Sequence, residues 1–267
     1  MIRAVVTGVG GRMGGRVIAL MAEVEGFELA GAVEAPGHPF VGQKVAEVLK
    51  VSKWEGVVVD DLTKVIPDAD VVIDFTIAKA ALNHLRIAHD NHKPMVIGTT
   101  GFSAAERQEL EELAKGIPVV LSPNMSVGVN LMLKLLKDVA TVLGDDYDVE
   151  IFETHHRMKR DAPSGTALRM AEVIAQASGR DLDKCAVYAR RGDVGPRKPG
   201  EIGIQAIRAG DIVGEHTAIF AGLGERLEIT HRCHSRDTFA KGALTAARWI
   251  IGKPNGLYDM QDVLGLK

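Results

Sequence analysis

The stretch Val5-Val6-Thr7-Gly8-Val9-Gly10-Gly11-Arg12-Met13-Gly14 decides the fold of the N-terminal half of the chain. It ends the β-branched run Ile2–Thr7, which is typical of a strand, and it leads into residues 13–24, whose apolar side chains recur at helical spacing. Glycines at positions 8, 11 and 14 permit unusual backbone angles and a close approach of helix to strand. The stretch therefore predicts a strand, a tight turn and a helix in direct succession.

This G-x-x-G-x-x-G turn also predicts a dinucleotide site. The helix N-terminus would offer N–H groups and the positive end of its dipole to a pyrophosphate. A second predicted strand, Phe27–Glu34, ends in an acid about 20 residues after Gly14, where an acid that binds the ribose hydroxyls is expected. The glycines alone would also fit a purely structural turn. Strand, turn, helix and Glu34 in register favour a dinucleotide.

Strands and helices alternate over about the first 125 residues. Further strands are predicted at Val57–Val59, Val71–Phe75, Met95–Gly98 and Val119–Ser122. Ser103 and Glu106 form a capping-box pattern for a helix that runs to about Gly116. The alternation predicts an α/β domain with a Rossmann-type, doubly wound parallel sheet. Residues 98–101 and 122–125 follow strand ends and are placed to line the nicotinamide half, although each could be an ordinary turn.

The pattern changes after Asn124. The predicted elements are a helix at Val129–Leu143, a strand at Asp148–Thr154, a helix at Gly165–Ala177, strands at Ile202–Arg208, Gly214–Phe220 and Arg226–Arg232, and a closing helix from about Ser235 to Ile251. This order predicts an α+β domain with a mainly antiparallel sheet. We expect a dinucleotide-binding domain at 1–126 and a second domain at 127–235. The glycine-rich, basic segment Arg190–Gly200 is the candidate for a mobile loop.

The amino-acid composition argues against several classes of protein, such as those that bind nucleic acid or membranes. A chain of 267 residues with 46% hydrophobic residues can form two cores. The net charge of −3 and the aromatic content of 4% argue against nucleic acid as a partner. Cys185 and Cys233 form no C-x-x-C pair, which fits a reducing compartment. Because neither a signal-peptide pattern nor a membrane-length apolar stretch is found, we expect a cytoplasmic protein that makes no membrane contact.

The segment Glu153–Thr166 contains the largest concentration of candidate catalytic side chains. Cationic or protonatable residues stand at positions 155, 156, 157, 159 and 160. Adjacent histidines on a strand point to opposite faces, so they suit acid/base work or anion contact better than metal binding. Ser164 is a candidate N-cap that would leave the N–H groups of Gly165 and Thr166 for a carboxylate. These features favour a small polyanionic substrate, and a solvated basic loop is the alternative. The His231–His234 cluster is interpreted as a strand end, so no metal is expected.

At these residues the chain resembles the 4-hydroxy-tetrahydrodipicolinate (dihydrodipicolinate) reductase family of bacterial lysine and diaminopimelate biosynthesis. The matching stretches are GVGGRMG at 8–14, VIDFT at 72–76, VIGTTGF at 96–102, NMSVGVNLMLKLL at 124–136, ETHHRMKRDAPSGTAL at 153–168, RAGDIVGEHTAIFAG at 208–222 and ERLEITHRCHSRDTFAKGAL at 225–244. The resemblance implies that NAD(P)H delivers hydride to C4 of a cyclic dicarboxylate, giving tetrahydrodipicolinate. It also implies a homotetramer formed through the second domain's sheet, with residues 236–267 packing back on the nucleotide domain.

The resemblance further assigns roles to residues. His155 would act in acid/base work or charge stabilisation, Lys159 would donate the proton, and His156, Gly165 and Thr166 would hold substrate carboxylates. The cofactor would contact Gly8, Val9, Gly10, Gly11, Arg12, Met13, Glu34, Gly98, Thr99, Thr100, Ser122, Pro123, Asn124 and Met125. Closure between the domains would bring nicotinamide and substrate together.

Two departures from the family pattern matter. Many relatives carry arginine after the ribose-binding acid, where it can meet the 2′-phosphate of NADPH, but here Ala35 follows Glu34. We therefore predict a preference for NADH, with Arg12 as the cation that would still allow some use of NADPH. Ile77-Ala78 stands where a proline commonly follows the DFT motif, and we interpret it as loop variation.

Two other functions stay open at this point. A semialdehyde dehydrogenase on similar architecture would need an activated thiolate, and neither cysteine has that setting. A nicotinamide sensor without chemistry would not require the His155–Lys159 cluster, and no basic face for DNA is evident.

Overall fold

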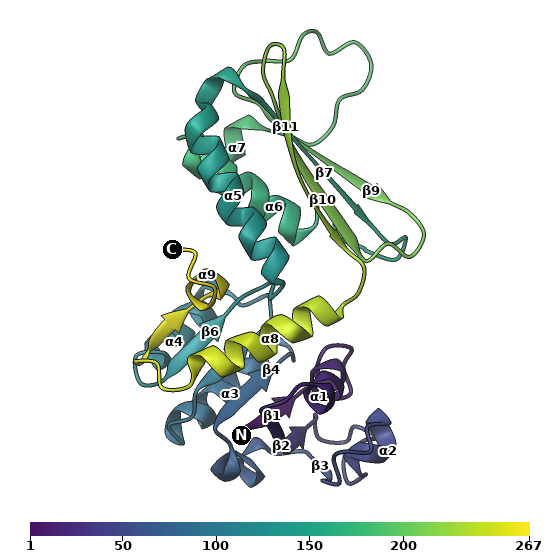
Figure 1. Cartoon of the computed structure of the whole chain (residues 1–267), viewed down its shortest axis with the longest axis vertical. Helices are drawn as coiled ribbons and strands as arrows, with labels where there is room; N and C mark the ends of the chain where they lie inside the picture. Colours follow the sequence, from purple (N-terminus) through teal and green to yellow (C-terminus); the bar gives the residue numbers. More distant parts are fainter. The chain divides into compact units, whose positions relative to one another are not determined.

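The computed structural model describes residues 1–267, which divide into two compact units. Unit 1 comprises Met1–Val127 and Asp237–Lys267, and unit 2 comprises Gly128–Arg236. Each unit has its own sheet (Figure 1), with two hydrophobic cores in unit 1 and one in unit 2.

Unit 1 contains a seven-stranded sheet in the order β12-β6-β5-β4-β1-β2-β3. Its strands are β1 (Ile2–Thr7), β2 (Phe27–Val33), β3 (Val58–Val59), β4 (Val71–Asp74), β5 (Met95–Ile97), β6 (Pro118–Leu121) and β12 (Gly256–Tyr258). Every neighbouring pair is parallel, which confirms the predicted doubly wound sheet. The strand order reverses at β1, so the carboxyl ends of β1 and β4 border the crevice where such sheets bind ligands.

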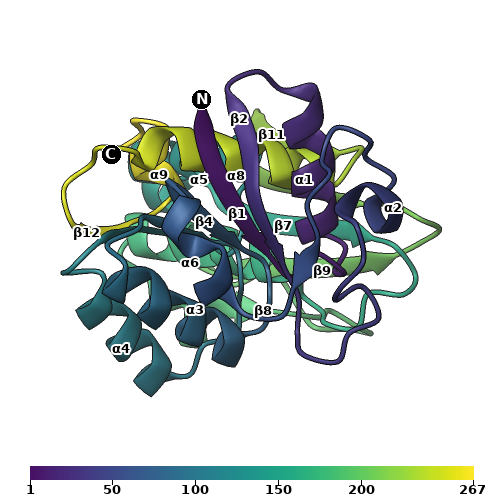
Figure 2. The ribbon, with the colours of Figure 1, turned by 90° about the horizontal axis from the view of Figure 1, so that it is seen from below.

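Helices cover both faces of this sheet, as Figure 2 shows. Along β1, Ala4 and Val6 pack with α1 (Gly14–Glu23) and α8 (Asp237–Ile250) in one core, whereas Val5 packs with α3 (Ala78–Asp90) and α4 (Ala104–Leu113) in the other. This alternation follows from the two-residue period of a strand. Shorter elements are α2 (Val45–Leu49), η1 (Leu62–Lys64), η2 (Ile66–Asp68) and α9 (Met260–Val263).

The capping box at the start of α4 is confirmed. The backbone N–H of Glu106 donates to Ser103 Oγ at 3.3 Å, and the Glu106 carboxylate accepts from the Ser103 N–H at 2.8 Å. In contrast, β12 was not predicted: after α8 the chain adds Gly256–Tyr258 to the sheet beside β6. A three-residue strand is too short to produce a periodic pattern in the sequence.

Unit 2 contains a five-stranded sheet in the order β11-β10-β7-β9-β8. Its strands are β7 (Asp148–His155), β8 (Ala186–Val187), β9 (Ile202–Arg208), β10 (Gly214–Ala221) and β11 (Arg226–Cys233). β10 is antiparallel to β7 and β11, whereas β9 is parallel to β7 and β8, so the sheet predicted as mainly antiparallel is mixed. The parallel pairing is possible because α6 (Gly165–Ala177) and α7 (Leu182–Cys185) form the crossover from β7 to β9.

One face of the unit 2 sheet is covered by helices. The long helix α5 (Val127–Leu143) is followed by η3 (Gly144–Asp146), and α5 and α6 share a core with β7, β9 and β10 (Figure 1). Ile151 of β7 and Ile204 of β9, which pair across the sheet, both point into this core.

The Arg190–Gly200 segment, expected to be a mobile loop, is anchored at two points. Arg190 bonds Glu150 and Glu201, each at 3.0 Å. Arg197 bonds Asp148 at 2.5 Å and contacts Glu150 at 3.2 Å. Both arginines thus hold the segment to β7.

Gly242 of α8 packs directly against backbone, because a Cβ there would overlap the carbonyl oxygen of Met125. We expect Gly242→Ala to destabilise unit 1 by about 3 kcal/mol, because backbone cannot move aside as a side-chain tip can. The measurement is urea unfolding, with a lower midpoint expected. Gly56→Ala is the matched control, since no atom lies within 4 Å of its Cβ position, and it should stay within about 1 kcal/mol of the wild type. Equal midpoints for the two variants would contradict this expectation.

Candidate functional site

The glycine turn in unit 1 is shaped by close backbone contacts. Gly8 has a φ of 74°, which favours glycine, and its N–H donates to the Val33 carbonyl at 2.9 Å. A Cβ on Gly14 would overlap the Gly8 carbonyl, so α1 can begin this close to the turn only with glycine there. Met13, the N-cap residue, makes no side-chain capping bond. The first-turn N–H groups of α1 therefore face the turn without a side-chain cap.

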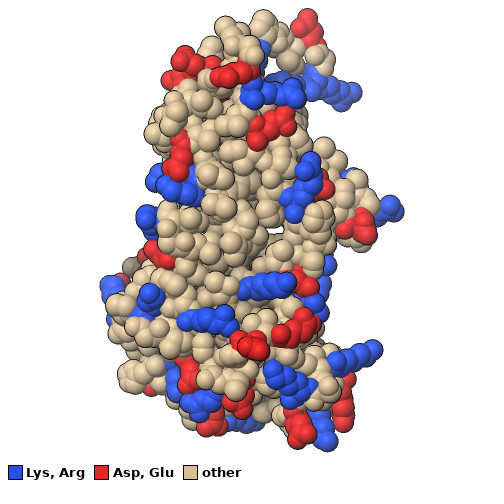
Figure 3. All heavy atoms as spheres, in the orientation of Figure 1, with Lys and Arg blue, Asp and Glu red and all other residues tan.

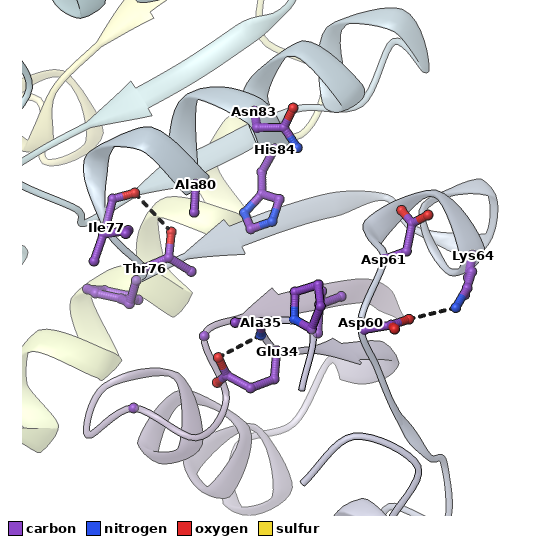
Figure 4. A pocket seen from close by; sticks show the side chains of 15 residues that line it. Glu34, Ala35, Asp60, Asp61, Lys64, Thr76, Ile77, Ala80, Asn83 and His84 are labelled. Atoms are coloured by element: carbon purple, nitrogen blue, oxygen red, sulfur yellow. Dashed lines mark hydrogen bonds and ion pairs between the residues drawn. The ribbon is translucent and has the colours of Figure 1, made fainter. Parts of the chain in front are cut away.

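The remaining turn residues differ in exposure. Val9 is buried in the core, Met13 is half-buried, and Gly10 and Arg12 are exposed. Glu34 lies beside the turn, since its carboxylate accepts from the Gly10 N–H at 2.7 Å. It also accepts from the Ala35 N–H at 2.8 Å (Figure 4). A carboxylate has about four acceptor sites, so two of them stay available for hydroxyl donors.

A cavity of about 810 Å³ opens beside the turn. It is lined by Gly8, Gly11, Val33, Glu34, Ala35, Pro36, Asp60, Asp61, Lys64, Phe75, Thr76, Ile77, Ala80, Asn83 and His84. Figure 4 shows Asn83 and His84 reaching it from α3, while Lys64 pairs with Asp60 at 2.6 Å. The structure thus brings Gly8, Gly11 and Glu34 to one cavity. The two aspartates escaped the sequence reasoning although they directly follow β3.

Asp74, the last residue of β4, has no exposed surface and is the centre of a hydrogen-bond cluster. It accepts from Thr7 Oγ1 at 2.6 Å, from Thr76 Oγ1 and Thr99 Oγ1 at 2.8 Å, and contacts His84 Nδ1 at 2.7 Å. Burial alone would raise the pKa of Asp74, but the hydrogen bonds from His84, Thr7 and Thr76 lower it below its usual value. Asp74 thereby ties together the end of β1, the middle of α3 and the loop after β5.

The loop after β5 was expected to contact the cofactor through three residues. A Cβ on Gly98 would overlap the Phe75 ring, so glycine lets that ring pack under the loop. Thr99 is buried and turned inward to Asp74, whereas Thr100 is exposed. Of the two threonines, only Thr100 has a side chain directed to solvent.

The loop after β6 is organised by its own side chains. Ser122 Oγ donates to the Asn124 carbonyl at 2.8 Å, and Asn124 Oδ1 accepts from the Ser126 N–H at 2.9 Å. Pro123 is exposed, but the Met125 side chain is only 1% exposed and belongs to the unit 1 core. Met125 therefore offers a ligand its backbone and not its side chain.

In unit 2, Glu153 is the centre of a second buried cluster. Its Oε2 lies 2.5 Å from His155 Nδ1 and accepts from Arg208 Nη1 at 2.8 Å. Its Oε1 accepts from Arg208 Nη2 at 2.8 Å and from the Ser164 N–H at 3.0 Å. Burial would raise the pKa of Glu153, but the bonds from His155 and Arg208 lower it to about 2. Glu153 is therefore a carboxylate throughout the physiological pH range.

The helix N-terminus predicted beside this cluster is present. Ser164 is the N-cap of α6 and its Oγ accepts from the Ala167 N–H at 3.2 Å. Because the cap is made to Ala167, it does not use the N–H groups of Gly165 or Thr166. Gly165 is exposed and Thr166 half-buried, so this end of the helix reaches the surface.

Lys159 and His156 lie in the loop between β7 and α6. Lys159 Nζ pairs with Asp161 at 2.9 Å, a contact that lowers the pKa of Asp161. His156 is half-buried, and its Nδ1 is shielded from water without a hydrogen bond inside the chain. A buried imidazole nitrogen without a partner is costly unless a ligand satisfies it.

His216 on β10 is a site neighbour that the sequence did not reveal. Its Nε2 lies 3.1 Å from Ser164 Oγ, and its ring meets the His155 ring edge-on with 5.1 Å between centroids. Burial lowers the pKa of His216 to about 3, with the nearby His155 as a further cause, so His216 is neutral at physiological pH.

Both units match known protein families. The family described as dihydrodipicolinate reductase, N-terminus, matches residues 2–125, and its C-terminus counterpart matches residues 128–264. The chain belongs to the dihydrodipicolinate reductase family. It is 55% identical over all 267 residues, the full length of both proteins, to the 4-hydroxy-tetrahydrodipicolinate reductases of Syntrophus aciditrophicus (strain SB) and Geotalea uraniireducens (strain Rf4).

The fold of this chain is similar to that of a solved structure. The dipicolinate-bound dihydrodipicolinate reductase from Paenisporosarcina sp. TG-14 matches with a TM-score of 0.74 and covers 98% of each chain. Its sequence identity of 24% limits that comparison to the fold. The expected fold class and family are both confirmed.

The remaining alternatives lose support from the described residues. Burial raises the pKa of the Cys185 thiol, and Cys233 is buried, so neither is the activated thiolate that a semialdehyde dehydrogenase needs.

No group of three or more His, Cys, Asp or Glu side chains is placed to hold a metal ion. None of the helices has the length and apolar composition of a membrane span. On the face drawn in Figure 3, basic and acidic side chains are interspersed.

Proposed function

We propose that this family member reduces 4-hydroxy-tetrahydrodipicolinate to tetrahydrodipicolinate in lysine and diaminopimelate biosynthesis, with NADH as the preferred hydride donor. The observation that carries the proposal is the full-length identity to reductases of that name. The site geometry supports it independently, because unit 1 has a glycine turn at the start of α1 and unit 2 has a cluster of basic residues at a helix N-terminus. NAD(P)H dependence is a property of this class of oxidoreductase.

The residues of unit 1 fit a dinucleotide. The glycines at positions 8, 11 and 14 place no side chain beside the start of α1, which allows a pyrophosphate to approach the α1 N-terminus. Glu34 is held with acceptor sites available for ribose hydroxyls. When bound, the reduced nicotinamide supplies the hydride. Residues 98–100 and 122–125, at the ends of β5 and β6, would line its ring.

The residues of unit 2 fit a small dicarboxylate. The α6 N-terminus offers N–H groups and a positive dipole end at Gly165 and Thr166, which would hold one carboxylate. The unpartnered Nδ1 of His156 is an additional candidate contact for a carboxylate oxygen. These groups would orient the ring of the substrate over Lys159 and His155.

His155 and Lys159 would supply charge and a proton. Hydride addition at C4 of a conjugated imine builds enamine-like negative charge, and the α-carbon then takes a proton. The Lys159 ammonium would donate that proton, and an imidazolium at His155 would stabilise the developing charge. Both groups lie within one loop and strand end of unit 2, next to the α6 N-terminus.

We expect His155→Ala and Lys159→Ala each to lower kcat by about 100-fold to 10,000-fold, the range for a positioned proton-transfer group. The dissociation constant for NADH should stay unchanged, because both residues lie in unit 2. The assay follows NADH oxidation with enzymatically generated substrate. Lys184→Ala, which removes an exposed lysine paired with Asp181 in the same unit, is the control. An inactive wild type would overturn the reductase proposal, and unchanged kcat in both variants would remove these residues from the mechanism.

The preference for NADH rests on charge near the ribose. Ala35 follows Glu34, so no cation stands where a 2′-phosphate would lie, and the same cavity contains Asp60 and Asp61. Its one lysine, Lys64, is paired with Asp60. A phosphate beside these carboxylates would be repelled, whereas a ribose hydroxyl would not. Arg12, exposed in the turn, is the cation that could still contact NADPH.

We expect the Michaelis constant for NADH to be at least about 10-fold below that for NADPH, the effect of roughly 1.4 kcal/mol of differential binding. Ala35→Arg should lower the constant for NADPH, because it adds a bidentate donor beside Glu34. Ala35→Leu, which adds bulk without charge, should not do so. A lower Michaelis constant for NADPH than for NADH in the wild type would show the proposed preference to be wrong.

The oligomeric state belongs to the same proposal. The face of the unit 2 sheet opposite α5 and α6 carries the apolar side chains of Phe152, Ile207 and Ile219, of which Phe152 is 36% and Ile207 47% exposed. A sheet face with exposed apolar side chains favours association. We propose that four chains associate through this face.

Light scattering of the wild type should therefore give the mass of four chains. Phe152→Asp should shift the mass to smaller species, because it places a charge on the associating face. Val142→Asp, at an exposed apolar position of α5 on the other side of unit 2, is the control and should remain tetrameric. The mass of a single chain for the wild type would contradict the proposal.

A further inference from the structure

One ring nitrogen of His155, Nδ1, contacts the buried carboxylate of Glu153. This nitrogen lies 2.5 Å from Glu153 Oε2, a carboxylate two residues earlier on the same face of β7. An ionised carboxylate can only accept hydrogen bonds, so the proton of this contact sits on Nδ1. Consequently Nε2 is the nitrogen left for a ligand and for proton exchange.

A glycine lies beside the other edge of the ring. A Cβ on Gly214, the first residue of β10, would lie 3.0 Å from His155 Nε2. Any side chain there would crowd this nitrogen. The start of β10 thus adds no side chain beside Nε2, while Glu153 binds the opposite edge of the imidazole.

Glu153 is the only anion in contact with the ring. Arg208 at the end of β9 binds both carboxylate oxygens of Glu153, and Ser164 at the start of α6 contributes its N–H. His216 on β10 touches the ring edge-on and is neutral, and the Lys159 ammonium is paired with Asp161. Among the groups facing His155 from β7, β9, β10, α6 and the loop before α6, only Glu153 therefore stabilises a positive imidazole ring.

We propose that Glu153 is a positioning residue of the reductase site, which fixes the Nδ1–H tautomer of His155 and supports its imidazolium form. Arg208 and the Ser164 N–H keep Glu153 ionised and immobile, so the orientation of the imidazole is set before the substrate binds. This inference rests on the role proposed above for His155 in the reaction. It adds a residue that never touches the substrate but decides which nitrogen of His155 does.

A purely structural role for Glu153, as an anchor for Arg208 and α6, predicts a different result. Loss of an anchor lowers stability and reduces the amount of active enzyme, but it leaves the pH dependence of that enzyme unchanged. Loss of a charge beside His155 makes the imidazolium less stable, so activity that depends on it is lost at a lower pH. The pH profile therefore separates the two roles.

The test compares Glu153→Gln, Glu153→Asp and the wild type by kcat and kcat/KM across pH. In Glu153→Gln we expect kcat to fall by about 100-fold and the alkaline limb of the pH profile to move to lower pH. Glu153→Asp, which keeps the charge, should return the limb toward its wild-type position. Glu172→Gln, at a half-buried acid of α6 paired with Arg169, should leave the profile unchanged. An unshifted limb in folded Glu153→Gln would overturn the proposal.

A second measurement needs neither a folded variant at position 153 nor turnover. Nitrogen-15 NMR of histidine-labelled wild type, with the His155 signals assigned by their loss in His155→Ala, reports which ring nitrogen carries the proton. We expect the neutral ring to carry it on Nδ1, and a proton on Nε2 would overturn the proposal. Because this result does not depend on activity, it fails separately from the reductase assignment.

Discussion

A carboxylate shielded from water must be surrounded by hydrogen-bond donors, and each unit is organised around one such group. In unit 1, Asp74 takes donors from the end of β1, the loop after β5 and α3. In unit 2, Glu153 takes donors from Arg208, His155 and the α6 N-terminus. Since removing one donor would leave a charge partly unsatisfied, these loops are fixed relative to their own sheets.

This constraint explains how the two sites are prepared for ligands. Asp74 draws Thr7 and Thr99 inward, so the backbone of the loops after β1 and β5 is held in place beside the crevice. Glu153 likewise holds the start of α6 in place, because it accepts a hydrogen bond from the Ser164 N–H, one residue before Gly165. A site whose dipoles are fixed in advance need not reorganise when charge develops.

The sequence predicts features that depend on neighbouring residues, and it fails for features that depend on contacts between residues far apart in the chain. The glycine turn, Glu34 and the capping box of α4 are short patterns in contiguous residues, and all three have the predicted local structure. Arg208 lies 55 residues from Glu153, and no local pattern indicates that they meet. The parallel pairing of β9 with β7 and the three-residue β12 depend in the same way on tertiary contacts.

Two histidines in unit 2 show why residue type alone cannot assign a role. The rings of His155 and His216 are 5.1 Å apart, and both lie on strands of one sheet. His155 Nδ1 contacts the carboxylate of Glu153, whereas His216 Nε2 contacts the hydroxyl of Ser164, and burial together with the nearby His155 ring lowers the pKa of His216 and keeps it neutral. Exchanging their surroundings would exchange their chemistry, because the neighbouring groups set the protonation state.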